Sequence, residues 1–283
     1  GQLSHRQGRG ALSMMAADRL DAIADEVRAA RDQERSPASF SAREPAFDIE
    51  AGYAVAARLH RARLAEGAVP RGRKIGFTNA AIWPEYDVHH PIWGWVYEHT
   101  MHASGARLPL AKLAEPKIEP EIAFGLSAAP AAGSDTAGLL ACIEWVAPAF
   151  EIVQSHFPGW KFQAADTIAD GGLHGALVLG RKVPVASLGD DPAAQLAGLT
   201  VRLTCDGKEI ETGRGSNVLG SPLAALAHLV ALLADQGAEV QLKPGEVVTT
   251  GTVTAAYPVR AGQAWRAEPA GIALAPVEVL FTA

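Results

Sequence analysis

One segment near the middle of the chain limits what the protein can fold into, because it places carboxylates inside an apolar, strand-like run. Residues 118–124 read Ile-Glu-Pro-Glu-Ile-Ala-Phe. Alternate side chains of a strand share a face, so Glu119 and Glu121 point one way while the isoleucines point the other. Burying a carboxylate without a partner is costly. The segment therefore predicts a strand with an apolar back and an acidic front that needs a compensating group.

A third carboxylate occurs in a similar setting further along the chain. Glu151 follows residues 145–150, which read Trp-Val-Ala-Pro-Ala-Phe. The Cα atoms of Glu119 and Glu121 would lie about 6.6 Å apart in a strand, close enough for both carboxylates to bind one ion. Three carboxylates suit Mg²⁺ or Mn²⁺, which prefer oxygen ligands, whereas zinc prefers histidine and cysteine. The alternative is that these glutamates are exposed charges that protect an edge strand from aggregation.

Other polar residues are candidates for acid–base chemistry or for holding a substrate. Lys74 lies in an otherwise apolar run, and a lysine beside a metal site can bind a substrate carboxylate or move a proton. The alternative for Lys74 is a basic turn in solvent. His156 and His174 are possible acid–base groups, although an isolated histidine is more often structural. Asp166 and Asp170 fit loop caps or residues that orient a neighbour.

The hydrophobic period divides the rest of the chain. Residues 18–33 and 48–67 carry apolar side chains at helical spacing and predict two amphipathic helices. From Arg73 onward, short apolar runs alternate with glycine and proline, which favours short β-strands over long βαβ units. One apolar helix is expected from Ser221 to Gly237. We therefore expect an expression-tag remnant at 1–15, a helical N-terminal segment at 16–72 and a β-rich catalytic domain at 73–283.

Turn signals locate further elements. Asp206-Gly207, between two strand-like runs, predicts a hairpin over residues 201–212. Residues 246–254 and 277–281 are expected to form closing strands. Residues 128–138 are rich in alanine, proline and glycine and predict a loop.

Composition and charge argue against several classes of function. Of the 283 residues, 48% are hydrophobic and 20% charged, as in ordinary soluble globular proteins. The net charge of −6, without a run of lysine or arginine, argues against nucleic acid as a partner. The apolar stretch 138–150 is too short to cross a bilayer, so no membrane partner is expected. Cys142 and Cys205 form no metal-ligand spacing or disulfide framework, which is typical of a cytoplasmic protein. Dinucleotide, phosphate-loop and serine-hydrolase motifs do not occur.

The order and spacing of the motifs resemble those of the 2-oxopent-4-enoate hydratase and 2-oxo-3-hexenedioate decarboxylase family, within the fumarylacetoacetate hydrolase superfamily. The resemblance runs from about Lys74 to the C-terminus and includes a helical N-terminal segment. The motifs that carry it are Lys74-Ile-Gly-Phe-Thr-Asn79, Pro91-Ile-Trp-Gly94, Ile118-Glu-Pro-Glu-Ile-Ala-Phe124, Phe150-Glu-Ile-Val-Gln-Ser155, Trp160-Lys-Phe162, Ala165-Asp-Thr-Ile-Ala-Asp170 and Thr250-Gly-Thr252. The resemblance implies an α+β fold, a mixed β-roll of the fumarylacetoacetate hydrolase type with packed helices and a small helical N-terminal segment, commonly assembled as a homo-oligomer.

The same resemblance implies roles for individual residues. Glu119, Glu121 and Glu151 match the family's metal ligands, with Mg²⁺ or Mn²⁺ as the cofactor. Lys74 matches its active-site lysine. The strand that lines the substrate corresponds to Thr250, Gly251 and Thr252.

Two segments depart from the family pattern. Where the hydratases usually carry an Asp-Asn-x-Ser type stretch, this chain reads Asp-Gly-Gly-Leu-His over residues 170–174. Many members also have an acidic residue where residues 91–93 read Pro-Ile-Trp. A polar lining is thus replaced by glycine, an aromatic neighbour and a histidine, which makes His174 a candidate replacement acid or base.

The function implied by the resemblance is that of a metal-dependent lyase. The chain is expected to hydrate 2-hydroxypenta-2,4-dienoate or a similar 2-oxo acid such as 2-oxopent-4-enoate during the degradation of aromatic compounds. The metal would stabilise the enolate, Lys74 would hold the carboxylate or relay a proton, and His174 or a metal-ordered water would assist protonation or water addition. The alternatives are a 2-oxo-3-hexenedioate decarboxylase, a C–C bond hydrolase of acylpyruvates and a 2-oxo acid binding protein without turnover. In the hydrolase, His156 or a histidine of the N-terminal segment would matter more than Lys74.

Overall fold

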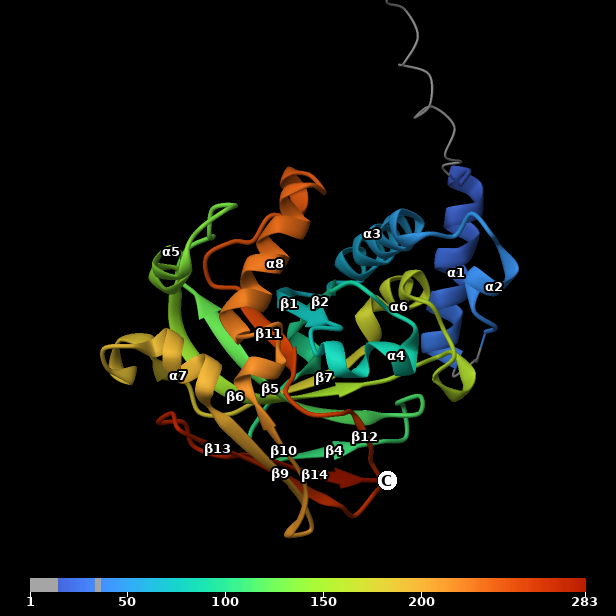
Figure 1. The fold of residues 1–283 in the computed structure, drawn as a ribbon. Coiled ribbons are helices and arrows are strands. Elements are labelled where there is room, and N and C mark those ends of the chain that lie inside the picture. Colours follow the sequence, from blue (N-terminus) through green and yellow to red (C-terminus); the bar gives the residue numbers. More distant parts are fainter. Residues whose placement is uncertain (1–14, 34–36) are drawn as a thin grey trace, which may run out of the picture.

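The computed structural model describes residues 15–33 and 37–283, so the tag predicted at 1–15 lies, apart from Met15, outside the described residues. Helices pack around two curled sheets (Figure 1). The helices are α1 (Ala17–Gln33), α2 (Phe40–Arg43), α3 (Ile49–Ala65), α4 (Trp83–Tyr86), α5 (Thr136–Ala141), α6 (Ala164–Ala169), α7 (Pro192–Gly198) and α8 (Pro222–Ala234). None of the helices in this part of the chain is long and apolar enough to cross a membrane.

The larger sheet carries the acidic segment at its centre. Within the described residues it has nine strands, seven of them in the order β2-β1-β11-β5-β6-β7-β3, with β12 paired to β5 and β8 to β6. These strands are β1 (Pro70–Gly76), β2 (Ile92–Tyr97), β3 (Met101–Ala103), β5 (Lys117–Leu126), β6 (Ile143–Val153), β7 (His174–Leu179), β8 (Val183–Pro184), β11 (Val247–Thr252) and β12 (Tyr257–Pro258). The long antiparallel β5–β6 pair places Glu119 directly opposite Glu151.

The smaller sheet is built mainly from strands of the C-terminal half of the chain. Its order is β10-β9-β13-β14-β4. The strands are β4 (Ala106–Pro109), β9 (Thr200–Cys205), β10 (Lys208–Arg214), β13 (Ala264–Ala270) and β14 (Val277–Thr282). The hairpin predicted at Asp206-Gly207 and the closing strand at the C-terminus are confirmed, because β9 pairs antiparallel with β10 across that turn and β14 pairs with β13.

The two helices predicted near the N-terminus are confirmed as α1 and α3. Asp48 caps α3 by accepting a hydrogen bond from the N–H of Ala51 at 2.9 Å. Apolar residues of both helices pack into one cluster with residues of the 157–169 region, and Figure 1 shows α1, α2 and α3 gathered beside α6. The division into a helical segment and a separate catalytic domain remains a prediction, since this cluster joins the two parts.

The predicted apolar helix is confirmed as α8. Ser221 caps α8 and Pro222 begins it, as predicted. The helix buries most of its girth against β11, α5 and α7.

The predicted loop 128–138 is wrong at its end, because α5 starts at Thr136. Asp135 accepts a hydrogen bond from the N–H of Gly138 at 2.8 Å, and this cap starts a helix that the composition of the segment hid.

Candidate active site

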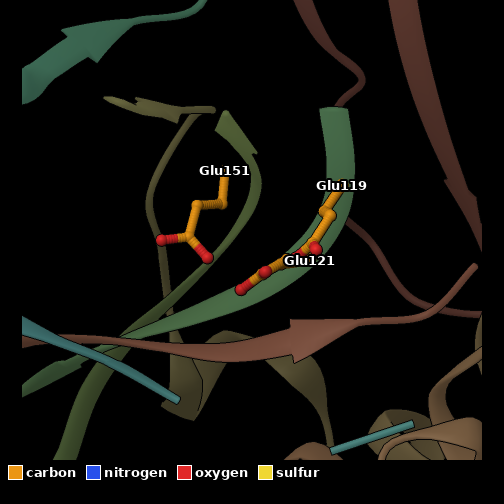
Figure 2. A group of neighbouring side chains, drawn as sticks. All are labelled: Glu119, Glu121 and Glu151. Atoms are coloured by element: carbon orange, nitrogen blue, oxygen red, sulfur yellow. The ribbon is translucent and has the colours of Figure 1, made fainter. Parts of the chain in front are cut away.

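Three carboxylates converge between the neighbouring strands β5 and β6. One oxygen from each of Glu119, Glu121 and Glu151 lies within 4.8 Å of the others. Figure 2 shows the three side chains pointing toward one another. Glu121 and Glu151 are buried and Glu119 is half-buried. This arrangement is not that of exposed edge-strand charges, because β5 and β6 are interior strands of the sheet.

Glu121 has one satisfied oxygen and one orphaned oxygen. Its Oε2 atom accepts hydrogen bonds from the Thr249 hydroxyl and from the N–H of Gly251, the latter at 2.9 Å. Its Oε1 atom is buried and has no hydrogen-bond partner among the described residues. A buried oxygen of this kind is costly unless a further group satisfies it. The donor set, which is all carboxylate oxygen, fits a hard divalent cation.

Glu151 is held from both sides by cationic or polar groups. Its Oε1 atom accepts a hydrogen bond from Lys74 Nζ at 2.8 Å, and its Oε2 atom lies 2.7 Å from His174 Nδ1. Lys74 Nζ also donates to the carbonyl of Gly172 at 2.7 Å. On the other side of the ring, His174 Nε2 lies 2.8 Å from the Thr100 hydroxyl, which itself donates to a backbone carbonyl. Both ring nitrogens of His174 therefore have a hydrogen-bonding partner.

Burial and neighbouring charges shift the pKa values of the three carboxylates in different directions. Burial, with the charge of Glu151, raises the pKa of Glu119 to about 7. Burial and the two neighbouring carboxylates raise the pKa of Glu121 well above its ordinary value. For Glu151, burial acts in the same direction, but Lys74 and His174 outweigh it and lower the pKa. Burial alone would lower the pKa of Lys74, yet the three carboxylates raise it. The cluster therefore carries excess acidic groups that a divalent cation would stabilise in their charged form.

A small cavity of about 30 Å³ lies beside this cluster. Lys74, Glu119, Gly251 and Thr252 contribute to its lining. The rest of the lining is mostly apolar and includes Ile75, Gly76, Phe77, Thr78, Ile82, Tyr86, Ile92, Val153, Trp160, Gly172 and Leu173.

The backbone around the cavity is strained. Phe77, Trp160 and Leu173 have φ angles of 55°, 59° and 65°, which side chains larger than glycine rarely adopt. All three residues line the small cavity. Strain of this kind persists where the surrounding structure enforces it and tends to cluster at functional sites. The strain therefore points independently to the same place as the carboxylates.

The structure brings most of the predicted site residues together. Lys74 and the three glutamates form one cluster, and Gly251 and Thr252 line its cavity. Thr250 does not line it, because its hydroxyl donates to the carbonyl of Ile122 at 2.7 Å. His174 lies behind Glu151 and outside this lining.

The other titratable candidates lie apart from the cluster. His156 Nδ1 lies 2.9 Å from Asp170, away from the carboxylates. Asp166 accepts hydrogen bonds from the N–H groups of Ser41 and Gln163, so it caps α6 and ties α2 to it.

Sequence reasoning missed Thr249 and Thr100. Thr249 supplies a hydroxyl to Glu121, and Thr100 supplies the far contact of His174. Thr249 belongs to a strand that was predicted, but its β11–β5 pairing, opposite Ala123, cannot be read from one strand alone. Nothing local marks Thr100, because its role depends on a contact with β7.

Comparison with known proteins finds a matching family and several relatives. The family described as fumarylacetoacetate (FAA) hydrolase C-terminal matches residues 73–279. A 2-hydroxyhexa-2,4-dienoate hydratase of Comamonas testosteroni is 33% identical over 232 residues, which cover 81% of this chain and 85% of that protein. A 2-keto-4-pentenoate hydratase of Paraburkholderia phymatum is 30% identical over 256 residues, covering 90% of this chain and 95% of that protein.

A solved structure is similar along nearly the whole length. The 4-oxalocrotonate decarboxylase from Pseudomonas putida G7, complexed with magnesium and adipate, superposes with a TM-score of 0.87 at 26% identity. The match covers 95% of this chain and 99% of that chain. The α+β roll expected from the sequence is confirmed, including the helical N-terminal part.

Proposed function

Since the chain belongs to the fumarylacetoacetate hydrolase family, we propose that it is a divalent-metal-dependent hydro-lyase that adds water to 2-hydroxypenta-2,4-dienoate or a closely related 2-oxo acid. The observation that carries the proposal is the cluster of Glu119, Glu121 and Glu151 with Lys74 hydrogen-bonded to one of its carboxylates. The relatives at 33% and 30% identity are named as hydratases of such short acids, which supports hydration as the reaction.

Glu119, Glu121 and Glu151 are the residues that would hold the metal, which we take to be Mg²⁺ or Mn²⁺. The orphaned Oε1 atom of Glu121 and the all-oxygen donor set support this assignment. When bound, such an ion supplies Lewis-acid stabilisation of the enolate oxygen that develops on a 2-oxo acid. The decarboxylase of similar structure was solved with magnesium.

Lys74 is proposed to bind the substrate carboxylate and to donate a proton. In the metal-free chain the surrounding carboxylates raise the pKa of Lys74, which favours its ammonium form. An ammonium has three N–H donors. Glu151 and the carbonyl of Gly172 take two of them, which leaves one donor for a substrate in the cavity that Lys74 lines.

His174 is proposed to be a positioning residue and not the acid or base that the sequence suggested. Its two ring nitrogens are engaged by Glu151 and Thr100, and its side chain lies outside the small cavity. A histidine behind a metal-binding carboxylate fixes the orientation of that carboxylate. Proton transfer to the substrate is left to Lys74 or to water.

A second candidate function is the decarboxylation of 2-oxo-3-hexenedioate, and Lys117 favours it. Lys117 precedes Glu119 by two positions on β5 and so shares its face. Lys117 Nζ lies 3.1 Å from the Tyr86 hydroxyl and 4.2 Å from the centre of the Trp160 ring, and both aromatic residues line the small cavity. A cation at this edge suits the far carboxylate of a dicarboxylate. The decarboxylase of similar structure holds adipate, which has two carboxylates.

A substrate panel tests the proposal and separates the two candidates. Purified protein with added Mg²⁺ or Mn²⁺ is given 2-hydroxypenta-2,4-dienoate, 2-oxo-3-hexenedioate or an acylpyruvate, and the products are identified by mass spectrometry. Hydration of the pentadienoate to 4-hydroxy-2-oxopentanoate is the expected result. Release of carbon dioxide from the hexenedioate, without hydration of the pentadienoate, would select the second candidate. Binding without turnover in every case would make the chain a 2-oxo acid binding protein.

Location and assembly are proposals as well. Cys142 and Cys205 are unpaired, which supports a reducing compartment such as the cytoplasm. The resemblance to a family of oligomers supports a homo-oligomer, which light scattering would test.

A further inference from the structure

We propose that the chain has a second ligand site, in which a cavity between the N-terminal helices and the edge of the larger sheet binds a small carboxylate with an apolar body. The cavity has a volume of about 310 Å³, within the range of small-molecule sites. Residues of α1, α3, β2 and β7 enclose it. The proposal rests on this lining and does not depend on the reaction proposed above.

This cavity is separate from the candidate active site. Among the described residues, none lines both cavities. The turn that leads into β7 forms the wall between them. Gly172 and Leu173 face the small cavity, whereas Gly171 and His174 face the larger one. A ligand in the larger cavity would therefore not compete directly with a substrate at the carboxylate cluster.

Cationic side chains outnumber acidic ones in the lining. Arg31, Arg63 and Lys112 contribute to it, and Asp32 is the one carboxylate residue among the described residues that line it. Arg31 is fixed in place by Asp170, with Nε 3.3 Å from a carboxylate oxygen and a terminal nitrogen 2.5 Å from the backbone carbonyl. Arg31 is paired with Asp170, and Arg63 lies 3.7 Å from Glu66, so Lys112 and the N–H groups that these pairs leave over are what the cavity offers an anion.

Two buried polar side chains offer further contacts. His156 is 4% exposed, and its Nδ1 atom lies 2.9 Å from both carboxylate oxygens of Asp170. This contact leaves Nε2 as the ring atom that can meet a ligand. Gln154 uses its carbonyl oxygen to accept from the N–H of Ala114 at 3.1 Å, which leaves its amide nitrogen as a donor. Both residues line the cavity, so it offers buried polar groups to a ligand.

Much of the remaining lining is apolar or aromatic. Tyr53, Ala56 and Leu59 of α3 line one side. On β2, the ring of Trp95 contacts two partners. His60 stacks on it at a centroid distance of 3.9 Å, and the buried guanidinium of Arg73 lies 3.7 Å from its centre. Such a wall suits the hydrocarbon part of a ligand whose carboxylate reaches the arginines.

Calorimetry with simple probes tests the class of ligand. The full chain is titrated with benzoate, acetate or benzyl alcohol in the presence of a chelator, so that no carboxylate can bind through a metal. We expect benzoate to bind one site per chain, and acetate and benzyl alcohol to bind at least about tenfold more weakly, because each lacks one of the two recognised parts. Equal affinities for benzoate and acetate would contradict the proposed apolar contact. Equal affinities for benzoate and benzyl alcohol would contradict the proposed recognition of the carboxylate. An absence of benzoate binding would overturn the site.

A matched pair of variants then locates the site. Arg63→Gln removes a charge that lines the cavity, whereas Arg61→Gln removes a charge from the exposed part of α3 that does not line it. Benzoate affinity should fall about tenfold or more in Arg63→Gln and stay within about twofold of wild type in Arg61→Gln. Circular dichroism verifies that both variants fold. Equal affinities in the two variants would contradict this location.

Discussion

At the residue scale, the buried contact between Lys74 and Glu151 explains how an ammonium and three carboxylates coexist inside a protein. Each charge is costly to bury alone. The short contact of 2.8 Å and the second hydrogen bond of Lys74 to Gly172 offset that cost. The ammonium is thereby held charged beside the cavity where a substrate carboxylate is proposed to bind.

The first prediction compares two candidate proton-handling residues. Lys74→Met should lower kcat/KM by about 10²- to 10⁴-fold, the usual contribution of a positioned acid–base group. His156→Gln, whose side chain lines the other cavity, should lower it far less. Steady-state kinetics on the substrate selected by the panel provides the measurement, with thermal unfolding as the check that Lys74→Met folds. Similar losses in both variants would require a different proton relay.

The second prediction concerns the choice between one and two carboxylates. Lys117→Met should reduce kcat/KM for a dicarboxylate by about tenfold or more and leave the monocarboxylate nearly unchanged. Lys161→Met is the matched control, because Lys161 is exposed and adjoins Trp160 in the chain. An equal effect of Lys117→Met on both substrates would show that Lys117 does not recognise the far carboxylate.

The third prediction follows from the pKa of Glu119, which is raised from 4.5 to about 7 in the folded chain. The folded state then binds the proton more tightly than the unfolded state between these two values. Glu119 therefore contributes to the free energy of unfolding of the metal-free protein. This contribution is fully present below about pH 4.5 and is lost as the pH rises to about 7. Urea unfolding at several pH values should show this loss in wild type relative to Glu119→Gln. Parallel pH profiles would contradict it.

At the element scale, the β5–β6–β11 strands place the site, and the sequence predicted part of this. Alternation in residues 118–124 correctly gave an acidic face to β5. The pairing of β1 with β11 and of β5 with β6 could not be derived from alternation, because each strand's period says nothing about its neighbour. The short helix α6 was missed for a similar reason. It is stabilised by the Asp166 contacts with Gln163 and Ser41, the second of which comes from a distant segment.

The fourth prediction tests the close approach of β11 to the segment that follows β1. Gly251 has a φ of 105°, and a Cβ atom there would lie 1.7 Å from the Thr78 hydroxyl oxygen. Gly262 has a φ of 90° but open space around it. Gly262→Ala should lower the free energy of unfolding by about 1–2 kcal/mol through backbone strain alone. Gly251→Ala should lower it clearly more and should disturb the hydrogen bond from the N–H of residue 251 to Glu121. Urea unfolding measures both, and equal losses would mean that β11 can move away from Thr78.

At the scale of the whole molecule, two cavities lie on opposite sides of the turn at residues 171–173. The sequence indicated one of them through its carboxylates and its resemblance to a family. It gave no sign of the other, because that lining collects residues from α1, α3, β2 and β7, whose positions depend on the tertiary fold. Both cavities contain residues of the segment 170–174, where the chain departs from the usual hydratase pattern. That departure is therefore relevant to the lining of both sites.

The central claim is that three carboxylates form one divalent metal site, and calorimetric titration with Mn²⁺ tests it most directly. Wild type and the control Glu144→Gln, an exposed change on the same strand as Glu151, should bind one ion per chain with equal affinity. Glu121→Gln should fold, because the pKa of Glu121 already favours a neutral side chain. It should lose affinity by more than the roughly 10- to 100-fold that follows loss of a supporting residue. Wild-type affinity for Mn²⁺ in Glu121→Gln would contradict the account.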